Sequence, residues 1–135
     1  MFLYQLNLPE KMAFLQLAKE LVIVDDNKID SEEMSMLILM CNEMQISIND
    51  VYSIEFSLEL LAKQFKDDIS QRICITELIL LAYSNGNYHP SQNILISSLQ
   101  NIFNFEESEI NQIESWVTKL SSIFKEGIQL IERKS

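Results

Sequence analysis

Apolar residues recur every three or four positions through most of this chain, and short polar turns separate the apolar segments. This spacing places apolar side chains on one face of an α-helix, so each segment predicts an amphipathic helix. Asn7 before Pro9, and Asp30 three residues before Glu33, are typical of helix starts. The predicted helices are 9–23, 30–45, 51–65 after a capping sequence at 47–50, 70–84, 90–103, and a long final one from about Ile110 past Gly127 to Ile131.

The apolar pattern repeats itself at an offset of 59 residues. The polar turn at Asp26 corresponds to the one at Asn85, and apolar positions on both sides of the turns correspond as well. Such pairs include Leu21 with Leu80, Leu37 with Ile96, and Met44 with Phe103. We therefore expect one domain, 1–135, built from two diverged helix–turn–helix repeats at about 9–66 and 69–126.

Composition supports an all-α fold, a compact bundle of about six to seven helices. Of the 135 residues 47% are hydrophobic, enough for a packed core, while two glycines and two prolines supply few hairpin turns. The formal charge of −10 excludes a nucleic-acid partner and favours a cation or a basic protein surface. No apolar run is long enough to insert into a membrane, and the isolated Cys41 and Cys74 are typical of a reducing, cytoplasmic setting.

The first polar turn concentrates the acidic side chains and is the candidate metal site. Clustered carboxylates are the ligands that Ca²⁺, Mn²⁺ and Mg²⁺ prefer. Lys28 and Ile29 interrupt the spacing that an EF-hand loop requires. A capping box formed by Asp30 and Glu33 would explain two of the acids without a metal. The candidate ligands are Asp25, Asp26, Asp30, Glu32 and Glu33.

The two turns together resemble those of the tellurite-resistance TerB-like domains. The first turn carries Asp26, Ile29 and the Glu32–Glu33 pair of that pattern, and the second carries Gly86 and Pro90. The resemblance covers roughly 9–117. It implies a compact helical bundle with an acidic face near the turns, acting as a binding or scaffold module in stress and tellurite-resistance systems, with no established catalytic site.

The sequence thus predicts a non-enzymatic interaction module with a protein partner, whose acidic turn is a candidate for binding a divalent cation or a basic segment. One alternative is a hydrolytic enzyme that uses paired carboxylates as acid and base. The other is a structural subunit that forms a homodimer through a methionine-rich helix. The methionines of that helix are Met34, Met36, Met40 and Met44.

Overall fold

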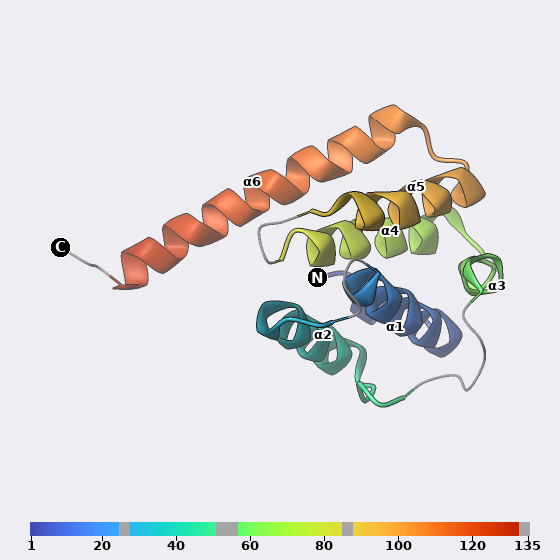
Figure 1. The fold of residues 1–135 in the computed structure, drawn as a ribbon, viewed down its shortest axis with the longest axis horizontal. Helices are drawn as coiled ribbons and strands as arrows, with labels where there is room; N and C mark the ends of the chain where they lie inside the picture. Colours follow the sequence, from blue (N-terminus) through green and yellow to red (C-terminus); the bar gives the residue numbers. More distant parts are fainter. Residues whose placement is uncertain (25–27, 51–56, 85–87, 133–135) are drawn as a thin grey trace.

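The computed structural model describes residues 1–24, 28–50, 57–84 and 88–132. This part of the chain is helical, and it confirms the prediction of an all-α bundle (Figure 1). A short 3-10 turn precedes six α-helices. The elements are η1 (Leu3–Gln5), α1 (Leu8–Ile23), α2 (Ser31–Met44), α3 (Leu58–Ala62), α4 (Asp68–Ala82), α5 (Pro90–Phe103) and α6 (Glu107–Glu132).

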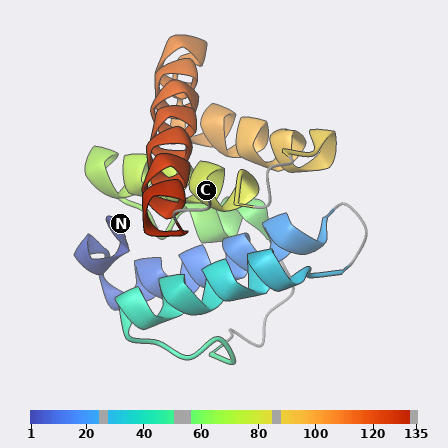
Figure 2. The same ribbon diagram turned by 90° about the vertical axis from the view of Figure 1, so that its left-hand side faces the viewer.

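Helix α4 lies at the centre of the bundle and packs against α1, α5 and α6. Its side chains are apolar around most of its circumference, and Ile75, Leu78 and Ile79 are completely buried. A helix that is hydrophobic all round has to be covered on every side, which explains its central position. Helix α2 packs on the far side of α1, while α6 crosses the opposite face of α4 (Figure 2).

Polar side chains fix the starts of the helices. Asn7 and Glu10 form a reciprocal capping box at α1, and Asp30 and Glu33 form one at α2, as predicted. Each box satisfies backbone N–H groups that have no partner inside the helix. Adding 59 to the bounds of α2 gives the bounds of α5.

Two residues in the left-handed conformation end the equivalent helices of the two repeats. Gln45, with a φ of 60°, follows α2, and Asn104, with a φ of 65°, follows α5. These two positions are also 59 residues apart. The repeat in the sequence therefore coincides with equivalent helix bounds and helix ends.

The third helix, predicted over 51–65, is shorter than expected where the structure describes it. The backbone N–H of Ser47 donates to the Asp50 carboxylate at 2.9 Å and closes a turn. Residues 51–56 lie outside the described segments. The helix begins only after Ser57, whose hydroxyl accepts from the N–H of Leu60, and it spans Leu58–Ala62.

The apolar spacing of α2 predicts a buried stripe of Met34, Leu37, Ile38, Cys41 and Met44. Leu37, Cys41 and Met44 are buried as expected, but Met34 and Ile38 are exposed. Because Glu33 turns inward to close its capping box, the helix buries the stripe that starts at that residue. Its apolar members are Leu37, Met40, Cys41 and Met44. Two of the four methionines of the proposed dimerisation helix are thus in the core.

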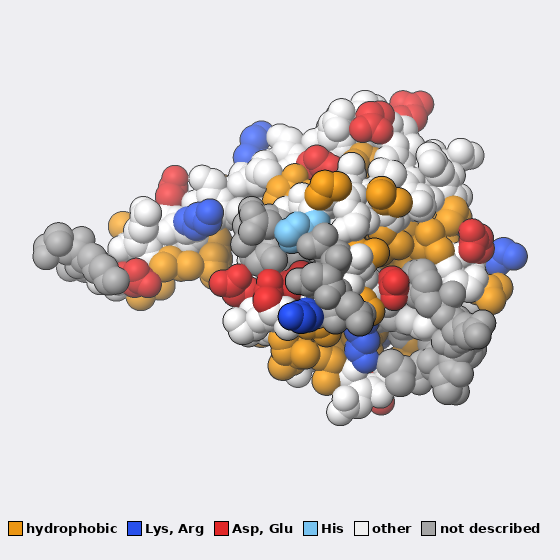
Figure 3. All heavy atoms as spheres, in the orientation of Figure 1, with side chains coloured by type: hydrophobic (Ala, Val, Ile, Leu, Met, Phe, Trp, Pro, Cys, Tyr) orange, Lys and Arg blue, Asp and Glu red, His pale blue; other side chains and the backbone are white. Residues whose placement is uncertain are grey.

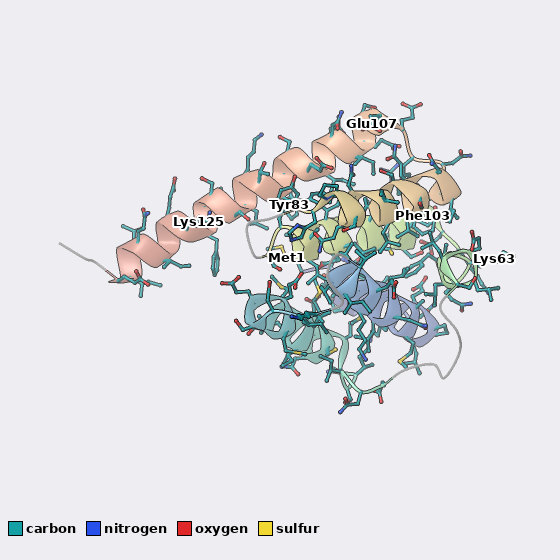
Figure 4. The ribbon with its side chains drawn as sticks, in the orientation of Figure 1. Met1, Lys63, Tyr83, Phe103, Glu107 and Lys125 are labelled. Atoms are coloured by element: carbon teal, nitrogen blue, oxygen red, sulfur yellow. The ribbon has the colours of Figure 1, made fainter. Side chains whose placement is uncertain are left out.

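Helix α6 extends well beyond the rest of the bundle (Figure 1). Glu107 begins the part that lies over the other helices, and Lys125 is on the part that projects away from them (Figure 4). The helix has 26 residues and is about 39 Å long, at 1.5 Å per residue. Nothing among the described helices is both long enough and apolar enough to cross a membrane.

Candidate functional site

Three of the five predicted metal ligands, Asp30, Glu32 and Glu33, lie within the described residues. Asp25 and Asp26 lie outside those residues. Glu32 is exposed in the first turn of α2. Asp30 accepts from the N–H of Glu33 at 2.7 Å, and Glu33 accepts from the N–H of Asp30 at 3.3 Å. The metal site remains a prediction, while the capping role of Asp30 and Glu33 is established.

Among the described residues, the His, Cys, Asp and Glu side chains form no group of three or more that could hold a metal ion. The two cysteines are buried, and burial raises the pKa of both thiols, which keeps them protonated. Cys41 and Cys74 therefore behave as small core residues.

Two tyrosines, Tyr83 and Tyr88, flank the second polar turn. The rings of Tyr83 and Tyr88 meet edge to face, with centroids 5.0 Å apart. Glu114 of α6 faces this pair, and burial, followed by the charge of Glu107, raises its pKa. Burial, and then the charge of Glu114, raises the pKa of both tyrosines. The raised pKa values favour neutral phenols, so two half-buried, uncharged aromatic rings lie beside Glu114.

Gln92 joins the second turn to the first repeat. Its carbonyl oxygen accepts from the backbone N–H of His89 at 3.1 Å, and its amide nitrogen donates to the backbone oxygen of Leu21 at 3.2 Å. Leu21 is in the last turn of α1, where backbone oxygens lack partners within the helix. One buried side chain therefore caps the start of α5 and the end of α1.

A second buried polar group, Glu77 of α4, holds the N-terminal residues. Its Oε1 accepts from the Met1 amino group at 2.8 Å and from the backbone N–H of Phe2 at 2.7 Å. The amino group also pairs with Glu43 of α2 at 2.8 Å. Burial lowers the pKa of this amino group, but the hydrogen bonds and charges of the two carboxylates outweigh it, so the pKa is raised overall.

One face of α6 is apolar along the helix and exposed in its projecting half, and we call this exposed part the α6 stripe. Ile110, Val117, Phe124 and Ile131 are spaced seven residues apart, and seven residues are nearly two full turns of helix. Ile110 and Val117 are 4% and 0% exposed, whereas Phe124 and Ile131 are 69% and 84% exposed. The same face that packs into the core thus continues into the projecting half, where nothing covers it within the described residues.

Several other apolar residues widen the α6 stripe in its projecting half. Ile123, Ile128 and Leu130 are exposed and Leu120 is half-buried. Hydrophobic side chains are visible along the edge of the projecting helix (Figure 3). At its inner end the stripe meets Trp116, which packs against Phe2 with ring centroids 5.9 Å apart. The α6 stripe consists of Leu120, Ile123, Phe124, Gly127, Ile128, Leu130 and Ile131.

Gly127 lies within the α6 stripe, and the fold of the single chain does not require it. A Cβ atom built at this position meets nothing within 4 Å, and the residue does not have a positive φ. A glycine inside a helix costs about 1 kcal/mol relative to alanine. The residue therefore weakens α6 without relieving any contact among the described residues.

Sequence reasoning predicted the amphipathic character of α6 but not that half of it is uncovered. Spacing indicates which side chains share a face, and it contains no information on what that face touches. No family model, curated protein or solved structure matches this chain. The similarity to TerB-like domains therefore stays a prediction.

Proposed function

We propose that this protein is a non-enzymatic interaction module that binds an amphipathic α-helix along the α6 stripe. The observation that carries the proposal is the change in exposure along one helical face, from Val117 in the core to Phe124 and Ile131 in solvent. Contiguous apolar patches on soluble proteins commonly mark interaction sites.

The shape of the surface favours a helical partner. A helix presents a narrow apolar ridge, and such ridges pack against a second helix with knobs of one fitting holes of the other. The seven-residue spacing of Val117, Phe124 and Ile131 is the spacing on which that packing depends. A groove for a small molecule would instead need concave walls.

Site-specific photo-cross-linking in cells tests the proposal. A photoreactive amino acid replaces Ile123 or Leu130 on the stripe, and Ser122 or Gln129 on the opposite face serve as matched controls. We expect protein adducts from the two stripe positions and far fewer from the controls, because only the stripe is covered by a partner. Equal yields from both faces would refute the proposal.

A further inference from the structure

We infer that the helix bound by the α6 stripe is the α6 of a second copy of this chain, packed antiparallel. This inference rests on the proposed function and names the partner. It follows from the symmetry of the stripe, from the position of Gly127, and from the distribution of charge along the chain.

The spacing of the central residues of the α6 stripe is the same in both directions along the helix. Leu120, Phe124, Gly127 and Ile131 are separated by four, three and four residues. A two-fold axis between residues 125 and 126 therefore places each of these residues opposite another member of the set, as an isologous dimer requires. The resulting pairs are Leu120 with Ile131 and Phe124 with Gly127, each joining one copy to the other.

This register gives a reason for the glycine. Phe124 is the largest side chain of the stripe, and it faces Gly127 of the second copy, where a Cβ atom would meet nothing within 4 Å in the single chain. A large residue opposite a small one lets two helices pack closely. Parallel pairing would place Phe124 against Phe124 and Gly127 against Gly127, which overfills one layer and leaves the next one empty.

The charges also favour the antiparallel arrangement. Residues 1–117 contain eighteen acidic and six basic side chains, a formal charge of −12, whereas 118–132 contain two of each. Antiparallel pairing places the two acidic bodies at opposite ends of a paired segment of about 22 Å, which is more than twice the screening length of about 8 Å at physiological salt.

The paired segment, Thr118–Glu132, is short, so the dimer is expected to dissociate on dilution. Sedimentation equilibrium from about 1 µM to 1 mM covers the affinities of such small interfaces. We expect a concentration-dependent mass that rises from one chain to two. Phe124→Asp should abolish the rise, and Ser122→Asp, on the opposite face, should retain it with the same helical content.

The Gly127→Leu variant tests dimerisation without disturbing the folding of the single chain. The added side chain meets open space in the single chain and favours the helix, but in the dimer it occupies the position of Phe124 from the second copy. We expect dissociation to become easier by about tenfold or more. Unchanged or tighter association would overturn the proposed packing of Phe124 on Gly127.

Cysteine cross-linking tests the register directly. Leu120→Cys and Ile131→Cys variants are mixed and oxidised, and each is also oxidised alone. The antiparallel register brings these two positions within the distance of about 7 Å that a disulfide requires, whereas two copies of position 120 are separated by about 16 Å along the axis. We expect cross-links only in the mixture. Cross-links in the separate samples would indicate parallel pairing and overturn the inference.

Different results would refute the proposed dimer and the proposed function. A chain that stays monomeric to about 1 mM overturns the second copy as the partner. If the stripe positions in cells then form adducts with a different protein, the interaction module stands with another partner. If they form no adducts above the control level, the proposed function fails as well.

Discussion

Replacing Gln92 should destabilise the protein through two helices that are far apart in the sequence. The side chain is 1% exposed, and it accepts from His89 and donates to Leu21. In the Gln92→Ala variant both hydrogen bonds are lost, at about 0.5 to 1.5 kcal/mol each, and the buried oxygen of Leu21 loses its side-chain donor, which costs about 1 to 3 kcal/mol. We expect a total loss of about 2 to 6 kcal/mol.

That loss is a large part of the free energy of unfolding, which is roughly 5 to 15 kcal/mol for most single domains. Urea unfolding followed by circular dichroism measures it as a lower midpoint with an unchanged slope. Glu33→Gln is the matched control, since Glu33 is the equivalent residue of the first repeat and glutamine keeps an oxygen for the N–H of Asp30. We expect that control to lose less stability than Gln92→Ala.

Gln92→Glu supplies the decisive comparison. The glutamate keeps an acceptor for His89 but places a buried carboxylate beside the oxygen of Leu21, and both burial and this contact would raise its pKa. Folding would then favour the protonated form, so the variant should be least stable at neutral pH and should approach the wild type as the pH falls toward 4. A Gln92→Glu variant as stable as the wild type at pH 7 would refute the hydrogen bond to Leu21.

Three shorter predictions concern other parts of the chain. Val117→Ala should lower the free energy of unfolding by about 2 kcal/mol, because Val117 is buried. Phe124→Ala, measured on dilute monomer, should change it by less than about 0.5 kcal/mol, because Phe124 is exposed. Equal losses of the two variants in urea titrations would contradict the exposure of the stripe. Because the pKa of the Met1 amino group is raised from 8.0, its pairing with Glu77 stabilises the fold fully below pH 8 and less as the pH rises through the raised pKa. Glu77→Gln should reduce the fall in stability between pH 8 and 10, and an unchanged profile in pH-dependent unfolding would argue against the pair. Calorimetric titration with Ca²⁺, Mn²⁺ and Mg²⁺ should show saturable binding that Asp26→Asn weakens if the acidic turn holds a metal, and equally weak heats from both proteins would exclude it.

Local sequence signals predicted the helix starts well, because capping depends on residues three positions apart. Asn7 and Glu10, and Asp30 and Glu33, are recognisable without knowledge of the fold. At Ser47 a similar signal closes a turn with Asp50, and the residues that follow lie outside the described segments. A hydroxyl or carboxylate can satisfy a backbone N–H in either setting, so the residue types alone do not decide between them.

The long-range polar contacts could not be predicted from the sequence. Gln92 reaches an oxygen 71 residues away, and Glu77 reaches an amino group 76 residues away. Both side chains occupy helices whose spacing predicts only an apolar face. The exposure of the outer half of α6 could not be predicted for a related reason. The spacing places Val117 and Phe124 on one helical face, and they differ only in what surrounds them.

The continuity of α6 has a consequence for amide hydrogen exchange. The backbone of one 26-residue helix runs from a covered environment at Ile110 to an uncovered one at Ile131. Opening the outer turns breaks few tertiary contacts, while opening the inner turns requires the body to unfold. Exchange should therefore slow progressively from the outer end inward along a single helix. Occupation of the stripe would flatten that gradient, so the outer amides report binding while the inner amides report the stability of the body.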